Sequence, residues 1–258
     1  MIRLGDAAGA SGFSLVSLES VDSTNRLALD LAEQAGANRT WVISEVQRAG
    51  RGRHGREWVS PAGNLYASLL LVAPCPTEDS PKLGFVAGVA LAEVVRKLAP
   101  AVETHLKWPN DVLVGNAKLA GILLEGRMLA GGRQAVAIGM GVNIASAPDL
   151  QDRAAASFSS LGIATDRRDV FRILSDRMAD QLAAFAQGQG FFKIRDAWSR
   201  LSLPPGTPLT VRLPKENLSG RFAGIDERGR LMLDQNGTLT HVEAGDVFLD
   251  GSRTGAGV

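Results

Sequence analysis

The stretch Gly50-Arg51-Gly52-Arg53-His54-Gly55-Arg56 lies between two segments, 41–46 and 64–72, whose apolar residues predict β-strands of a folded core. Glycines allow positive φ angles and let a ligand approach the backbone closely. Arginine guanidinium groups suit planar contacts with carboxylate or phosphate groups. The stretch therefore predicts a loop that can close over an anionic ligand.

Two other interpretations of this loop stay open at this point. Taken alone, glycines and arginines in a row are more often a solvated surface loop. An RNA-binding Arg-Gly segment is the second alternative, but such segments are usually long, repeated and disordered. Here Trp58, Ser60, Pro61 and Asn64 lead directly back into a strand, which favours an ordered loop.

The composition predicts an ordinary globular protein. The 258 residues are 45% hydrophobic and 21% charged, with a formal net charge of +1. This near-neutral balance does not favour a protein that depends on electrostatic attraction to nucleic acid. No signal peptide and no membrane-spanning apolar run is recognisable, so we expect a cytoplasmic protein with neither membrane nor nucleic acid as partner.

Cysteine and histidine usage excludes several kinds of site. The single cysteine, Cys75, rules out an intramolecular disulfide. The histidines at 54, 105 and 241 are not spaced four residues apart, so we expect no protein metal site.

The order of elements predicts an α+β fold. Strands are expected at 13–18, 105–108, 111–114, 118–125 and 134–143, besides the two around the loop, and helices at 25–35, 81–98, 166–188 and 191–201. This order predicts a mixed or antiparallel sheet with helices on one side. Residues 1–12 resemble a loose lead-in.

The pattern changes after Leu203-Pro204-Pro205-Gly206. Short β segments follow at 209–213, 218–225, 230–234, 238–243 and 247–249, and Asn236-Gly237 is a strong hairpin signal. We therefore expect a larger domain at 1–205, a small β-barrel at 206–250 and a disordered tail at 251–258.

A second constellation is Leu106-Lys107-Trp108-Pro109-Asn110-Asp111. A lysine held by a tight turn between two strands can deliver a fixed charge to an oxyanion or a phosphoryl oxygen. A simple hairpin with a solvated lysine is the alternative. Gly121, Gly139 and Gly141 weaken their strands unless a ligand or another backbone comes close. Neither a Walker-type phosphate loop nor a dinucleotide fingerprint is present.

Four more motifs belong to the same pattern: Asp22-Ser23-Thr24-Asn25, Gln47, Lys118-Leu119-Ala120-Gly121-Ile122-Leu123 and Gly139–Asn143. Taken in order with the Gly/Arg stretch and the Lys107 turn, they resemble the catalytic core of biotin–protein ligases. The resemblance covers about residues 13–200, and the β segments after 206 resemble the C-terminal SH3-like domain of that family. It implies a class II synthetase-like biotin/lipoate ligase core, a mixed sheet flanked by helices.

The resemblance also implies an activity. Biotin–[acetyl-CoA-carboxylase] ligases activate biotin with ATP to biotinyl-5′-AMP and transfer the biotin to a lysine of a biotin carboxyl carrier protein. The substrates would be biotin and ATP, and Mg²⁺ would enter through the ATP phosphates.

Roles for individual residues follow from the same resemblance. Lys107 and Arg53 would be catalytic. Biotin would contact Ser23, Thr24, Asn25, Gln47, Arg51, Gly52, Arg53 and Lys107. ATP or the adenylate would contact Arg51, Arg53, Trp58, Asn110, Lys118, Gly121 and Asn143.

One position departs from the family pattern, which usually has arginine where this chain has His54; we expect this to tune the ordering of the loop or the retention of the adenylate. Because about a dozen residues precede the first expected strand, we also expect a monofunctional ligase without an N-terminal DNA-binding domain. A homodimer through an edge strand stays open.

The nearest competing function is a lipoate or octanoate–protein ligase, which shares the core fold. Those enzymes lack the Gly-Arg-Gly-Arg loop, and octanoyl transfer would need a cysteine nucleophile or its equivalent. Cys75 lies in Ala73-Pro74-Cys75-Pro76 without an evident activating partner.

Overall fold

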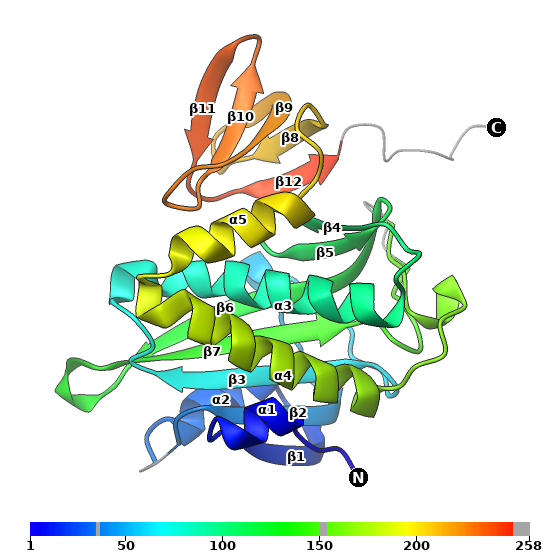
Figure 1. Cartoon of the computed structure of the whole chain (residues 1–258), viewed down its shortest axis with the longest axis vertical. Coiled ribbons are helices and arrows are strands. Elements are labelled where there is room, and N and C mark those ends of the chain that lie inside the picture. Colours follow the sequence, from blue (N-terminus) through cyan, green and yellow to red (C-terminus); the bar gives the residue numbers. More distant parts are fainter. Residues whose placement is uncertain (35–36, 150–153, 250–258) are drawn as a thin grey trace.

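Two β-sheets and five α-helices make up the protein (Figure 1), whose computed structural model describes residues 1–34, 37–149 and 154–249. The larger sheet has seven strands and the smaller one has five. The tail expected to be disordered, 251–258, lies outside the described residues.

The larger sheet is mixed, as the order of elements predicted. Its strand order is β1-β2-β3-β7-β6-β5-β4. Strands β1 and β2 pair in parallel, and all other neighbours are antiparallel. The strands are β1 (Ser14–Val21), β2 (Thr40–Gln47), β3 (Leu65–Val72), β4 (Thr104–Lys107), β5 (Asp111–Val114), β6 (Ala117–Met128) and β7 (Gln134–Val142).

Helices cover both faces of this sheet, so the expectation of helices on one side was wrong. The helices are α1 (Asp6–Ala10), α2 (Thr24–Leu31), α3 (Leu83–Leu98), α4 (Arg167–Phe185) and α5 (Phe191–Leu201). Because side chains alternate along a strand, Trp41 and Ile43 of β2 join the main core under α3 and α4, whereas Val42 joins a second cluster with Ala28 and Leu29 of α2. The short α2 thus lies against the opposite face.

The N-terminal residues also differ from expectation. Instead of a loose lead-in, they form α1, which packs on α4. Tertiary contacts outweigh the weak local signal: the Gly5 N–H donates to Ser175 Oγ at 2.8 Å, the Ala8 N–H donates to Asp176 Oδ1 at 3.0 Å, and Ala8 is fully buried.

The predicted β region after residue 206 is a five-stranded antiparallel sheet. Its order is β11-β10-β9-β8-β12, with β8 (Pro208–Arg212), β9 (Asn217–Ile225), β10 (Leu231–Gln235), β11 (Thr238–Val242) and β12 (Asp246–Leu249). Asn236 and Gly237 both have positive φ, as the predicted hairpin requires. This sheet lies against α5 and the end of the larger sheet (Figure 1), and Trp108 Nε1 donates to Gly229 O across the junction at 3.0 Å.

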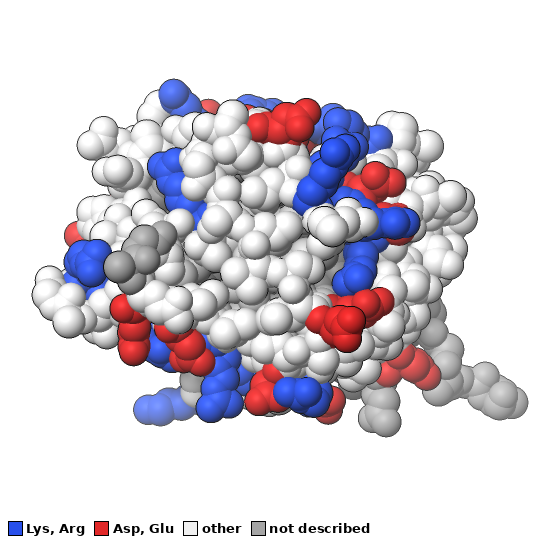
Figure 2. Space-filling model, turned by 90° about the horizontal axis from the view of Figure 1, so that it is seen from below, with Lys and Arg blue, Asp and Glu red and all other residues white. Residues whose placement is uncertain are grey.

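Strand β1 forms one edge of the larger sheet. Viewed from that end, the molecule has a mostly uncharged centre with acidic and basic side chains around its rim (Figure 2).

A buried amide fixes the segment that enters β3. Asn64, 2% exposed, accepts three backbone N–H groups, from Ile144, Ala145 and Ser146, at 2.8 to 3.2 Å. Its Nδ2 donates to Ser146 O at 3.0 Å. The chain that leaves the Gly/Arg loop is therefore tied to the chain that leaves β7.

Replacing this amide should destabilise the fold. We expect Asn64→Ala to lower the free energy of unfolding by about 2–4 kcal/mol, because it leaves several buried N–H groups unpaired. Asn116→Ala, at an exposed turn position, is the matched control and should change it by less than about 0.5 kcal/mol. Equal urea-unfolding midpoints for the two variants would contradict this.

Candidate functional site

One cavity collects every residue to which the sequence analysis assigned a role. It lies between α2, the Gly/Arg loop, β6 and β7 of the larger sheet, and β12 of the smaller sheet. Its walls include Ser23, Thr24, Asn25, Gln47, Arg51, Gly52, Arg53, Trp58, Lys107, Asn110, Lys118, Gly121 and Asn143. The structure thus brings these residues together, while their individual roles remain predictions.

The tip of α2 forms a polar wall of the cavity. Ser23 is the N-cap residue, and its Oγ accepts the Arg26 N–H at 3.4 Å. Gln47 Oε1 accepts both the Thr24 N–H, at 2.9 Å, and the Thr24 hydroxyl, at 3.0 Å. Gln47 Nε2 donates onward to Ser60 Oγ at 3.2 Å. The local capping chemistry therefore also arranges the polar groups of the site.

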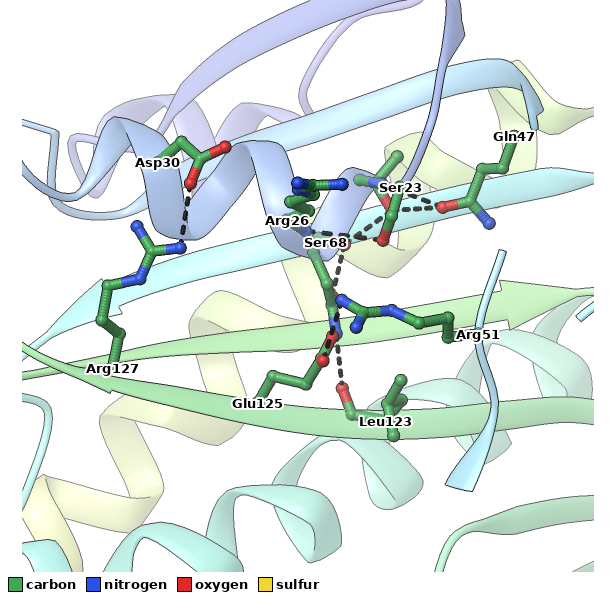
Figure 3. Close-up of polar contacts among 11 residues, drawn as sticks. Ser23, Arg26, Asp30, Gln47, Arg51, Ser68, Leu123, Glu125 and Arg127 are labelled. Carbon is green, nitrogen blue, oxygen red and sulfur yellow. Dashed lines mark hydrogen bonds and ion pairs between the residues drawn. The ribbon is translucent and has the colours of Figure 1, made fainter. Parts of the chain in front are cut away.

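Asn25 extends this wall toward β6 and β7. Its Nδ2 donates to Leu123 O at 3.1 Å and to Glu125 Oε2 at 2.8 Å, and its Oδ1 accepts the Ser68 hydroxyl at 2.6 Å (Figure 3). A Cβ at Gly139 would lie 2.5 Å from Asn25 Oδ1. The glycine in β7 is thus explained by the close approach of this amide.

The Trp58 ring packs closely against two glycine positions of the sheet. Gly121 and Gly141 are paired across β6 and β7, and a Cβ at Gly141 would lie 2.5 Å from the Trp58 ring. The Lys118 ammonium lies 5.2 Å from the ring centroid, within the range of a cation–π contact. Among the described residues, the buried Trp58 Nε1 has no hydrogen-bond partner.

A buried carboxylate joins two lysines at the floor of the cavity. Asp111 Oδ2 lies 3.0 Å from Lys107 Nζ, and Asp111 Oδ1 lies 2.5 Å from Lys118 Nζ. Burial would raise the pKa of Asp111, but the two ammonium groups outweigh it and hold that pKa well below its usual range. These three residues therefore place one negative charge between two positive charges at the floor of the cavity.

Lys107 is not the solvated lysine of a simple hairpin. Its side chain is 10% exposed, and Nζ also donates to Val247 O of β12 at 2.8 Å. An ammonium group has three N–H donors. Within the described part of the chain, two of them have partners, so one remains for a ligand oxygen.

The Gly/Arg loop contacts the smaller sheet. Gly52 N–H donates to Arg56 O at 2.7 Å, and a 3₁₀ turn, Arg53–Gly55, closes the loop. Asp246 of β12 forms ion pairs with Arg53 at 3.7 Å and with Arg56. His54 Nε2 lies 3.6 Å from the same carboxylate.

Two of the assigned residues make mainly structural hydrogen bonds. Asn110 Nδ2 donates to Ile122 O at 2.8 Å, and Asn143 Nδ2 donates to Ala156 O at 3.1 Å. These amides fix the backbone around the cavity, and Asn110 Oδ1 also lies 3.5 Å from Arg53 Nη1.

Sequence reasoning missed several residues of the cavity. Asp111 was part of the recognised motif but received no role, although an acidic residue between two lysines was a usable signal. Asp246, Val247 and Phe248 also line the cavity. No local signal points to them, because they lie in another sheet far along the chain.

The described residues hold no group of three or more His, Cys, Asp or Glu side chains that could bind a metal ion. No helix within 1–34, 37–149 or 154–249 has the length and apolar character needed to cross a membrane.

Comparison with known proteins gives a consistent result. The profile of the biotin/lipoate A/B protein ligase family matches residues 17–143, and that of the biotin protein ligase C terminal domain matches residues 206–250. A biotin–[acetyl-CoA-carboxylase] ligase of Paracoccus denitrificans is 38% identical, covering 91% of this chain and 100% of that protein. Its counterpart in Mycobacterium tuberculosis is 35% identical, covering 93% and 90%.

A solved structure supports the same relationship. The biotin protein ligase of Aquifex aeolicus, in complex with biotin and ATP, superposes with a TM-score of 0.76 at 27% identity. The match covers 92% of this chain and 98% of that one.

The Asp111 arrangement makes a testable contribution to stability. We expect Asp111→Asn to lower the free energy of unfolding at pH 7 by about 3 kcal/mol, because it leaves two buried ammonium groups without their counter-charge. Asp180→Asn is the matched control: Asp180 pairs with Arg177 while 46% exposed, and its loss should cost less than about 1 kcal/mol.

The same comparison should depend on pH. The pKa of Asp111 is lower in the folded state than in the unfolded chain, so acidification protonates the unfolded chain first. The stabilisation by Asp111 is fully present above about pH 5. It is lost as the pH falls through the ordinary pKa of aspartate toward the lower pKa that Asp111 has in the folded protein. The stability difference between wild type and Asp111→Asn should therefore shrink below about pH 4; a constant difference would contradict the assignment.

Proposed function

Because the chain belongs to the biotin/lipoate A/B protein ligase family, and is related to biotin–protein ligases along most of its length, we propose that it activates biotin with ATP and transfers it to a lysine of a carrier protein. The observation that carries the proposal is the pair of ammonium groups, Lys107 and Lys118, fixed by Asp111 beside the polar wall of α2.

The polar wall suits the ureido ring of biotin. Ser23, Thr24 and Gln47 offer hydroxyl and amide groups at the cavity surface, and such groups can satisfy both the N–H and the C=O of a cyclic urea. Ligand pockets commonly combine a few fixed polar groups of this kind with apolar walls. Asn25 would support this wall from behind through its contacts with β6.

The two lysines would stabilise the charge that develops during activation. A biotin carboxylate that approaches the α-phosphate of ATP brings two anionic groups together, and fixed cations beside them offset the repulsion. The remaining N–H of Lys107 is the donor proposed for the carboxylate or phosphoryl oxygen. Lys118, with Trp58, Asn110, Gly121 and Asn143, would form the adenylate side of the cavity.

Two displacements make up the proposed reaction. A carboxylate oxygen of biotin attacks the α-phosphorus of ATP, the bond to the β-phosphate oxygen breaks, and pyrophosphate leaves. The ε-amine of the acceptor lysine then attacks the carbonyl carbon of biotinyl-5′-AMP, AMP leaves with the electron pair, and the amine gives up a proton. The chain's task is positioning and charge stabilisation.

The Gly/Arg loop would protect the mixed anhydride from water between the two steps. Arg51, Gly52 and Arg53 line the cavity from this loop, so the guanidinium groups of the two arginines can reach an anionic ligand. We propose that residues 1–205 carry the chemistry and that residues 206–250 complete the cavity through β12.

Mg²⁺ would be held mainly by the ATP phosphates, which is the usual arrangement for this ion; the described residues offer no carboxylate cluster for it.

The acceptor we propose is a biotin carboxyl carrier domain of an acetyl-CoA carboxylase, as the names of the relatives indicate. Since ATP is the activating substrate, we propose the cytoplasm as the place of reaction.

Lipoate or octanoate ligation is the alternative. A transfer through a cysteine is not supported, because burial raises the pKa of the Cys75 thiol, whereas a nucleophilic cysteine needs a lowered pKa. Pyrophosphate release with lipoate alone, in assays with ATP, each acid and a carrier domain, would favour the alternative and contradict the main proposal.

Removing the Lys107 ammonium tests the proposed charge stabilisation. We expect Lys107→Ala to slow biotin-dependent pyrophosphate exchange by about 100-fold or more, with the circular dichroism spectrum unchanged. Lys97→Ala, at an exposed position of α3, is the control and should keep the wild-type rate. A Lys107→Ala variant with near-normal turnover would refute the role.

Removing the Arg53 side chain tests the protective loop. Arg53 contacts Asn110, Gly245 and Asp246, so Arg53→Gly should loosen the loop. We expect the adenylate to dissociate about tenfold faster, detected as biotinylation of bystander proteins. Unchanged dissociation would show that the loop does not retain the adenylate.

A further inference from the structure

Glu125 on β6 links two parts of the cavity wall and has no role in the scheme above. Its Oε2 accepts Asn25 Nδ2 at 2.8 Å, and its Oε1 lies 3.0 Å from Arg51 Nη2 (Figure 3). Asn25 belongs to α2, whereas Arg51 belongs to the Gly/Arg loop. One carboxylate therefore joins the polar wall to the loop.

On the Asn25 side, the contact determines which way the amide faces. Asn25 is 3% exposed and uses both N–H donors, one on Leu123 O and one on Glu125. Its Oδ1 accepts the hydroxyl of Ser68, which also lies 2.7 Å from Thr24 Oγ1. A continuous set of polar contacts thus runs from Glu125 through Asn25 and Ser68 to Thr24.

On the Arg51 side, the contact holds a cavity-lining guanidinium. The Arg51 side chain is 48% exposed, so this ion pair is worth little for stability, because exposed pairs contribute about 1 kcal/mol or less. What it determines is position. Arg51 is the first arginine of a glycine-rich loop, and in the described part of the chain this is its one ion pair.

The same strand and helix provide an internal comparison. Arg127, two residues after Glu125 on β6, pairs with Asp30 of α2 at 2.9 Å (Figure 3). This pair also joins β6 to α2, but neither residue lines the cavity. A variant that lacks the Arg127–Asp30 pair therefore serves as a control, because it removes an ion pair between β6 and α2 that lies outside the cavity.

We propose that Glu125 is a positioning residue for biotin activation, which holds Arg51 at the cavity wall and keeps the Asn25 amide in the orientation that supports Thr24. The inference rests on the proposed function. Glu125 acts through these two neighbours and not by contact with the reacting atoms.

The chemistry of the carboxylate predicts that a neutral side chain at position 125 cannot keep both contacts. Both oxygens of an ionised carboxylate accept hydrogen bonds, and both face donors here. A glutamine side chain has one acceptor oxygen and one NH₂ group that only donates. Either Asn25 Nδ2 or Arg51 Nη2 would therefore face another N–H group. Glu125→Gln keeps the size of the side chain but removes both the double acceptance and the charge that pairs with Arg51.

The experiment compares Glu125→Gln, Arg51→Gln, the double variant and Asp30→Asn in steady-state, biotin-dependent pyrophosphate exchange. We expect Glu125→Gln to raise the KM for biotin about tenfold, with a smaller change in kcat. Asp30→Asn should keep the wild-type KM. The thermal unfolding midpoints of Glu125→Gln and Asp30→Asn should agree within about 2 °C.

The double variant distinguishes positioning from a purely structural effect. If Glu125 acts largely through Arg51, the double variant should raise the KM little more than the stronger single variant does. Fully multiplicative effects of the two substitutions, or a wild-type KM in Glu125→Gln, would overturn the inference. Absence of biotin-dependent exchange in the wild-type protein would instead refute the proposed function, so the two failures are distinguishable.

Discussion

The arrangement of the site depends on the buried carboxylate of Asp111. An ionised carboxylate in the protein interior is costly unless it is paired, and Asp111 has the ammonium of Lys107 beside one oxygen and that of Lys118 beside the other. The two lysines come from different strands, β4 and β6. Their ammonium groups are therefore fixed relative to each other by a third residue, which is what an electrostatic site needs in order to act without rearrangement.

Contacts of β12 with Lys107 and with the Gly/Arg loop explain why the smaller sheet belongs to the site. Lys107 donates to the Val247 carbonyl, and Asp246, the residue before it, pairs with Arg53 and Arg56 of the Gly/Arg loop. Strand β12 is thus in contact with the proposed catalytic lysine and with the loop that covers it. A substitution of Asp246 would therefore remove contacts that hold the Gly/Arg loop against β12.

Much of this could be predicted from the sequence, because the informative residues lie within short motifs. The N-cap at Ser23, the turn from Lys107 to Asp111 and the glycines of β7 each have a local physical signature, and the structure brings them to one cavity. The contacts of Asp246 and Val247 could not be predicted, because nothing local relates a strand of one sheet to a loop of the other. Helix α1 was missed because tertiary hydrogen bonds to Ser175 and Asp176 stabilise it. Glu125 carried no signal, since its position resembles any charged strand residue.

In the proposed reaction, the Asp111-paired lysines, and not the loop arginines alone, bind the anionic phosphoryl centre. The most direct measurement is a crystal structure of the protein with a non-hydrolysable sulfamate analogue of biotinyl-5′-AMP. We expect Lys107 Nζ or Lys118 Nζ to lie within hydrogen-bonding distance of the sulfamate group or the adjoining carbonyl, with Asp111 still between the two lysines. An analogue bound with its linker held by the arginines, and with both ammonium groups out of reach, would contradict it.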